Sequence, residues 1–183
     1  MRGGKLRMLT VLDEYTRECR CIHVDRKINA SKVRQVMARL IDEHGTPEHI
    51  RSDNGSEFIE YHLREWLARE GIKTLYIDPG SPWQNGYIES FHARFREECL
   101  NREQLWTLTE ARVVIEDWRF KYNHIRPHRS LGYVTPIQFA GLALEASPLT
   151  VPAASVRRSL DFLYNLKESL TPPRLTNYAA QFG

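Results

Sequence analysis

The chain has 183 residues, a length that suits one domain with a tail. Its content of 42% hydrophobic and 27% charged residues is typical of a soluble globular protein, and no window holds the roughly 18 uninterrupted apolar residues of a membrane span. The net charge of +3 is too small to define a partner. Three cysteines, Cys19, Cys21 and Cys99, are too few and wrongly spaced for a disulfide framework or a zinc site, so a reducing cytoplasm is the simplest compartment.

Strands and helices are predicted to alternate along the chain. An apolar strand over 6–12 and an alternating strand over 17–24 are joined by the hairpin-length connection DEYT. A helix follows from Asn29, with apolar residues at helical spacing up to Ile41 and a stop at Gly45. The further predicted elements are a strand over 48–52, a helix from Ile59 to Gly71, a strand over 72–77 and helices over about 87–100 and 109–122. This order predicts a partly parallel α/β sheet with helices packed on it.

Two carboxylates have placements that suggest a site. Asp53 follows the strand over 48–52, where it either caps an Asx turn or serves as a ligand at the mouth of the sheet. Glu89 lies in the first turns of the helix over 87–100, thirty-five residues further on. Carboxylates that gather at one place repel one another unless a cation neutralises them, and oxygen ligands favour Mg²⁺ or Mn²⁺.

Basic residues accompany this pattern. Arg96 lies seven residues after Glu89, about two helical turns on, and His92 lies between them. This stripe suits a metal and a phosphate backbone, or else it is an ordinary solvated helix face. The segment 17–39 holds seven basic and two acidic side chains, which fits either a nucleic-acid face or a solvated surface.

Three stretches are similar to a known family. "SDNGSEF" (52–58), "SPWQNGYIESFHARFREECLN" (81–101) and "YNHIRPHRSLGYVTP" (122–136) together resemble the integrase core of DDE transposases, above all the second-reading-frame transposases of bacterial insertion sequences. The resemblance covers roughly residues 3–142. It implies a ribonuclease-H-like mixed sheet flanked by helices, a three-carboxylate metal site, cutting and joining of transposon-end DNA, and a homo-oligomer for the complete protein. The motif spacing disfavours an unrelated ribonuclease-H-like nuclease.

The resemblance also implies roles for individual residues. Asp53 matches the second catalytic Asp and Glu89 the catalytic Glu, both as ligands of Mg²⁺ or Mn²⁺. Arg96 matches a basic residue that contacts DNA, and His92 and Asn85 are further candidates for DNA contact. The segment 78–87 matches a mobile active-site loop, in which Trp83 either stacks on a base or packs within the loop.

The likeness breaks at the first carboxylate. The family's first catalytic Asp lies on a strand that precedes the one matched by residues 6–13, and Asp13 itself is expected to be a turn residue. The missing strand belongs in the middle of the sheet, so its loss predicts two unpaired edges. We therefore expect an N-terminally truncated core that is inactive alone. The alternative is a non-catalytic remnant that only binds DNA or associates with intact transposase.

The C-terminal part is predicted to lie outside the core. Residues 1–142 make up the partial catalytic core, and residues 143–183 are read as a linker and a tail. Within the tail, residues 156–170 are compatible with one short amphipathic helix.

Overall fold

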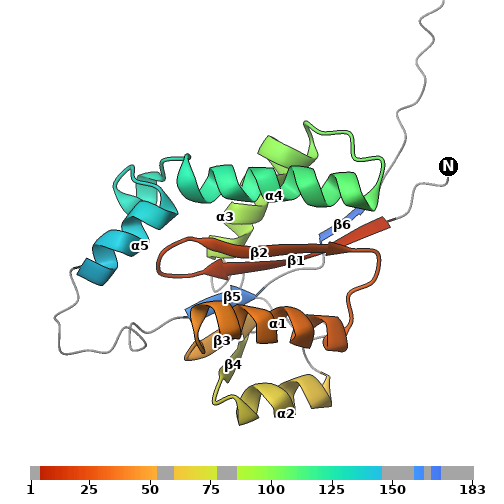
Figure 1. Cartoon of the computed structure of the whole chain (residues 1–183), viewed down its shortest axis with the longest axis vertical. Coiled ribbons are helices and arrows are strands. Elements are labelled where there is room, and N and C mark those ends of the chain that lie inside the picture. The colour runs from red at the N-terminus through yellow and green to blue at the C-terminus, as the bar shows by residue number, and fades with distance from the viewer. Residues whose placement is uncertain (1–4, 53–59, 78–85, 146–158, 163–165, 170–183) are drawn as a thin grey trace, which may run out of the picture.

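The computed structural model describes residues 5–52, 60–77, 86–145, 159–162 and 166–169, the last two ranges by their backbone. It shows a sheet with helices on both faces (Figure 1). In chain order the elements are β1 (Lys5–Asp13), β2 (Cys19–Asp25), α1 (Ala30–His44), β3 (His49–Ser52), α2 (Tyr61–Arg69), β4 (Lys73–Tyr76), α3 (Gly86–Phe95), the π-helix η2 (Arg96–Leu100), α4 (Leu108–His124), the 3-10 helix η3 (Arg129–Leu131), α5 (Pro136–Glu145), β5 (Ser159–Phe162) and β6 (Leu166–Ser169).

The sheet is mixed. Its strand order is β2-β1-β5-β3-β4, and β6 pairs with β1 beside this path. β1 is antiparallel to β2 and to β5, whereas β3 is parallel to both β4 and β5. Because β3 and β4 are parallel, their carboxyl ends lie at the same end of the sheet. α/β proteins commonly place functional side chains at the carboxyl ends of their strands.

β1 is apolar on both faces because helices cover both. Leu6, Met8 and Leu12 join a cluster with α3 and α4, and Leu9 and Val11 join a second cluster with α1 and α2. Figure 1 shows these helix pairs on opposite sides of the sheet. The alternation follows from the period of two along a strand, and it confirms the apolar strand predicted over 6–12.

Local signals set the helix ends as the sequence predicts. The side chain of Asn29 accepts a hydrogen bond from the N–H of Lys32 at the start of α1. At the other end, Gly45 has φ 82° and donates its N–H to the carbonyl of Ile41. A glycine tolerates this positive φ without the steric cost that a Cβ would bring.

The centre of the sheet differs from the expectation. The position between β1 and β3, predicted to be empty, is occupied by β5 from the C-terminal part of the chain. The helix predicted over 156–170 is therefore wrong, because β5 and β6 are strands within that range. Unpaired N–H and C=O groups on β1 and β3 are costly inside a fold, and pairing with both strands outweighs a weak helical pattern.

None of the helices in the described ranges is both long and apolar enough to cross a membrane.

Candidate active site on the α3 face

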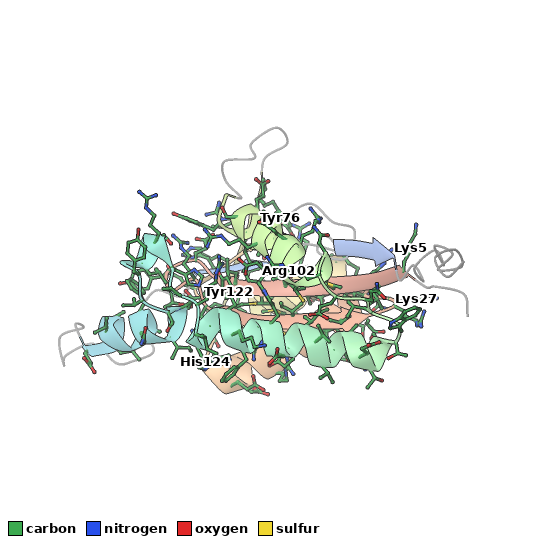
Figure 2. The ribbon with its side chains drawn as sticks, turned by 90° about the horizontal axis from the view of Figure 1, so that it is seen from above. Lys5, Lys27, Tyr76, Arg102, Tyr122 and His124 are labelled. Carbon is green, nitrogen blue, oxygen red and sulfur yellow. The ribbon has the colours of Figure 1, made fainter. Side chains whose placement is uncertain are left out.

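Large aromatic rings fix α3 against α4 and the sheet. Phe91 and Phe95 are almost fully buried, as the helical stripe through Ile88 predicts. The ring of Phe91 lies 4.9 Å from that of Tyr122, and the ring of Phe95 lies 4.8 Å from that of Trp118. Figure 2 shows the side chains of α4, with Tyr122 labelled among them. Because packed rings cannot shift independently, the position of α3 is well determined.

His92 belongs to this packed interior, which corrects its assignment as a DNA contact. Its ring is 8% exposed, and its Nε2 lies 3.2 Å from the hydroxyl oxygen of Thr10 on β1. Burial, with a smaller contribution from the nearby Arg96 guanidinium, lowers the pKa of His92 from 6.5 to about 4. Residues three apart on a helix lie on neighbouring positions of one face, which is why the sequence pattern groups His92 with Glu89. In the structure His92 instead lies in the core with Phe95, which is three residues further on.

Glu89 and Arg96 lie on the exposed side of the same helical segment. Glu89 is in the first turn of α3, where the helix dipole favours a negative charge. Gly86, Tyr87 and Ser90 from this end of α3 line a cavity of about 320 Å³ together with Leu12 of β1. The start of α3 therefore lies next to the carboxyl end of β1, and Glu89 and Arg96 are exposed to solvent.

The strand register shows where β3 runs relative to α3. Leu12, Asp161 and Arg51 form one row across β1, β5 and β3. Because β3 and β1 run in opposite directions, following β3 past Arg51 leads toward the level of Thr10, where His92 attaches α3. Asp53 comes directly after the last residue of β3 in the sequence, but it lies outside the described residues, as do Trp83 and Asn85. Its role stays a prediction.

Asp13 is a turn residue, as predicted. One carboxylate oxygen accepts hydrogen bonds of 3.0 Å from the N–H groups of Tyr15 and Thr16. The other lies 3.3 Å from a guanidinium nitrogen of Arg20. The residue is 1% exposed and its carboxylate oxygens have partners, so Asp13 is committed to holding the β1–β2 turn.

Part of the basic excess in 17–39 is neutralised locally. Arg20 pairs with Glu18 at 2.8 Å as well as with Asp13, and Lys32 lies 3.5 Å from Asp25. The guanidinium of Arg17 lies over the ring of Tyr87 at the start of α3, 3.3 Å from its centroid. Arg17 is therefore the member of this segment that lies at the candidate site.

Asp161 is a residue that sequence reasoning missed. It lies in β5, the strand at the position where the sequence predicts a vacancy, and it pairs in register with Leu12 and Arg51. The stretch "SLDF" alternates apolar and polar residues, which is a strand signal, but four residues are too short to outweigh the helical pattern around them.

The donor chemistry suits a hard divalent cation. Across the described residues, no three His, Cys, Asp or Glu side chains are grouped closely enough to hold a metal. The exposed carboxylate of Glu89 offers oxygen ligands, and His92 is already engaged with Thr10. With Asp53 as a further oxygen donor the set would fit Mg²⁺ or Mn²⁺ rather than zinc.

Comparisons with known proteins agree with this architecture. Two models described as "Integrase core domain" match residues 1–82 and 70–136. The chain is 44% identical over 136 residues to a 39.2 kDa protein of insertion element IS476 from Xanthomonas euvesicatoria, covering 74% of this chain and 39% of that protein. It is 40% identical over 152 residues to a 31.7 kDa protein of insertion element IS407 from Burkholderia multivorans, covering 83% of this chain and 54% of that protein.

A solved structure shares the fold. A chain of the simian T-cell lymphotropic virus intasome in complex with a PP2A regulatory subunit superposes with a TM-score of 0.60 at 16% identity, over 82% of this chain and 55% of that chain. The fold is therefore ribonuclease-H-like, of the class found in integrase catalytic cores. The chain belongs to the integrase core family, and its relatives are proteins of bacterial insertion elements. It spans about two fifths to one half of the length of those relatives.

Proposed function

We propose that this chain is the catalytic core of an insertion-sequence transposase, which binds the ends of its element and cuts and joins DNA strands. The observation that carries the proposal is the α3 face. In this integrase-type sheet, β3 runs toward the level of Thr10, where His92 attaches α3 to β1. Glu89 is exposed in the first turn of α3. Insertion-element relatives and the two integrase-core matches support it.

Asp53 and Glu89 are the proposed metal ligands. Both would supply carboxylate oxygens, from the end of β3 and the start of α3 respectively. A bound Mg²⁺ or Mn²⁺ pair would activate the attacking hydroxyl and stabilise the leaving oxygen. The protein's own task is to hold the two carboxylates at a fixed separation, which the packing of α3 onto β1 serves.

Asp161 is the candidate for the third carboxylate. Its row in β5 lies between β1 and β3, the place to which the resemblance assigns the first catalytic Asp. The expectation that the chain is inactive alone depends on that place lacking a carboxylate. With Asp161 there, we expect weak cutting activity from the chain as it stands.

Strand cutting tests the assignment directly. The purified chain is incubated with a duplex carrying the ends of its element and Mn²⁺, beside variants Asp53→Asn, Glu89→Gln and Asp161→Asn. Loss of a metal ligand should lower cutting by roughly a hundredfold or more, because such metal clamps account for several kcal/mol of the barrier. Glu97→Gln, an exposed residue of η2, is the matched control and should cut normally.

Metal binding and DNA binding separate the possible outcomes. Mn²⁺ binding, followed by electron paramagnetic resonance, should weaken in Asp53→Asn and Glu89→Gln even if cutting is too slow to measure. Arg96→Gln should weaken DNA binding and flatten its dependence on salt by about one phosphate contact. Salt-dependent DNA binding with neither cutting nor Mn²⁺ binding would instead identify a non-catalytic DNA-binding remnant.

A further inference from the structure

The candidate site is divided between two parts of the sheet. α3, which carries Glu89, is attached to β1 through His92 and Thr10 and through the cluster that includes Leu12. The other proposed ligand follows β3, which pairs with β4. β1 and β3 are not neighbours in the sheet, because β5 lies between them (Figure 1).

β5 and β6 pair along most of β1. β5 is opposite Val11 to Asp13, and β6 is opposite Lys5 to Met8, both antiparallel. From the residue paired with Val11 to the residue paired with Met8, the chain goes forward by four positions, from 162 to 166. Over the same stretch β1, which is antiparallel, goes back by three. On its other side β5 pairs in parallel with His49, Ile50 and Arg51 of β3.

This central strand is joined to the rest of the chain by a long connection. Thirteen residues, 146–158, separate the end of α5 at Glu145 from the start of β5 at Ser159. Such a length reaches up to roughly 45 Å when extended, so it imposes little constraint on where the strand docks. The sequence ASPLTVPAASVRR is rich in Pro, Ala and Ser, as linkers are.

We propose that β5 and β6 act as an intramolecular strand ligand. β5 binds the slot between β1 and β3 and β6 pairs along β1, so that together they close the sheet and position the two halves of the active site relative to each other. Main-chain pairing to both neighbours provides the affinity, as in strand addition to a sheet edge, here doubled because the slot has two edges. The ion pair between Arg51 and Glu14, at 2.8 Å, is a second tie between β3 and the turn after β1. The positioning role rests on the proposed function, whereas the docking of the strand does not.

Cleavage of the connection tests the docking in the folded chain. A protease site placed within 146–158 is cut after folding, and the product is analysed by size exclusion and by amide hydrogen exchange. We expect the C-terminal piece to co-elute with the core. If it separates and the amides of β1 and β3 then exchange faster, the slot has been emptied, which also supports docking. Separation with unchanged exchange in β1 and β3 would overturn the proposal.

A proline in the strand provides the second measurement. Leu160 pairs with Asp13 and Ile50, so Leu160→Pro removes a backbone donor from the centre of the slot. Exchange at the β1 and β3 amides should accelerate by roughly tenfold or more, because these strands would open locally. Ala154→Pro, in the connection, is the matched control and should leave exchange unchanged. Equal exchange in both variants contradicts the proposal, and if Leu160→Pro does not fold, the cleavage experiment decides.

Mn²⁺ binding separates this inference from the proposed function. If the strand positions the site, Leu160→Pro should bind Mn²⁺ several-fold more weakly than both Ala154→Pro and Asp161→Asn, because the loss then exceeds that of the candidate ligand Asp161 alone. Faster amide exchange with unchanged Mn²⁺ affinity would still support docking of the strand but would refute its role in positioning the site. If the unmodified chain binds no Mn²⁺ while the strand docks, the proposed function fails and the docking stands.

Discussion

The two faces of the sheet are packed by different kinds of side chain. On the α3 and α4 face, Phe91, Phe95, Trp118 and Tyr122 interlock, and Phe91 contacts the other three rings. On the α1 and α2 face the buried residues are aliphatic and come from many positions, namely Val33, Val36, Met37, Leu40, Ile50, Leu63, Leu67 and Ile72. The face that carries the candidate site thus adds a group of large rings to its smaller apolar residues, whereas the buried residues of the opposite face are all of the smaller kind.

This difference predicts unequal responses to truncation. Phe91→Ala should lower the free energy of unfolding by about 3–5 kcal/mol, because it removes a ring that is 2% exposed and leaves a large cavity. Leu63→Ala on α2, at 1% exposure, removes fewer atoms and should cost less than Phe91→Ala, within about 2–5 kcal/mol. Urea unfolding of both variants measures the contrast. A cost for Leu63→Ala equal to that for Phe91→Ala would show that the aromatic cluster has no special share.

Acidification should also act on the α3 face. Burial lowers the pKa of His92 to about 4, below its ordinary value of 6.5. Between pH 4 and pH 6.5 the imidazole is therefore protonated in the unfolded chain and neutral in the folded chain. Stability from this group is therefore complete above about pH 6.5 and is lost as pH falls toward 4, by about 3 kcal/mol.

Unfolding at several pH values checks this. The wild type should lose more stability between pH 6.5 and 4 than His92→Gln does. Part of the slope should persist in the variant, because burial also lowers the pKa values of His23 and His128. Identical slopes for the two proteins would mean that His92 is not held neutral by its surroundings.

The turn after β1 tests the assignment of Asp13. Asp13→Ala removes the acceptor for the N–H groups of Tyr15 and Thr16 and leaves Arg20 without one of its two carboxylates. We expect a loss of about 2–3 kcal/mol, since buried donors lose their partner. Asp13→Asn keeps an acceptor oxygen and should cost less. If Asp13→Ala abolished Mn²⁺ binding without destabilising the chain, Asp13 would be a ligand rather than a turn residue.

Local order could be predicted from the sequence where local physics sets it. The spacing of Val33, Val36 and Leu40 and the stop at Gly45 define α1 without reference to the rest of the chain. The apolar run of β1 and the stripe of α3 likewise identify their buried positions. These patterns also placed Glu89 on an exposed helical turn, but they could not separate it from His92, because the two are one turn apart and only the packing against Thr10 shows which one is buried.

Long-range pairing could not be predicted. Residues 159–162 become a central strand because β1 and β3 present unpaired backbone to them, more than one hundred residues away in the case of Ile50 and Leu160. No pattern inside "SLDF" encodes those partners, and the surrounding helical spacing favours the wrong element. The strand β5, whose position is set by tertiary pairing, is thus both the largest correction to the predicted fold and the element that contains the candidate carboxylate Asp161.

Helix caps give the smallest expected contrast between the faces. Thr107 begins α4 with a capping box, in which its hydroxyl accepts from the N–H of Glu110 and the Glu110 carboxylate accepts from the N–H of Thr107. Asn29 begins α1 with a single side-chain hydrogen bond from Lys32. Thr107→Ala and Asn29→Ala should each cost about 1 kcal/mol, with the capping box slightly more sensitive because its two hydrogen bonds depend on each other. Thermal unfolding of the two variants, with Thr107→Ser as the conservative control, measures this.

Because capping is local, neither variant should alter Mn²⁺ binding. A loss of Mn²⁺ binding in Thr107→Ala would show that the site depends on the position of α4 more strongly than the packing of Phe91 and Phe95 implies.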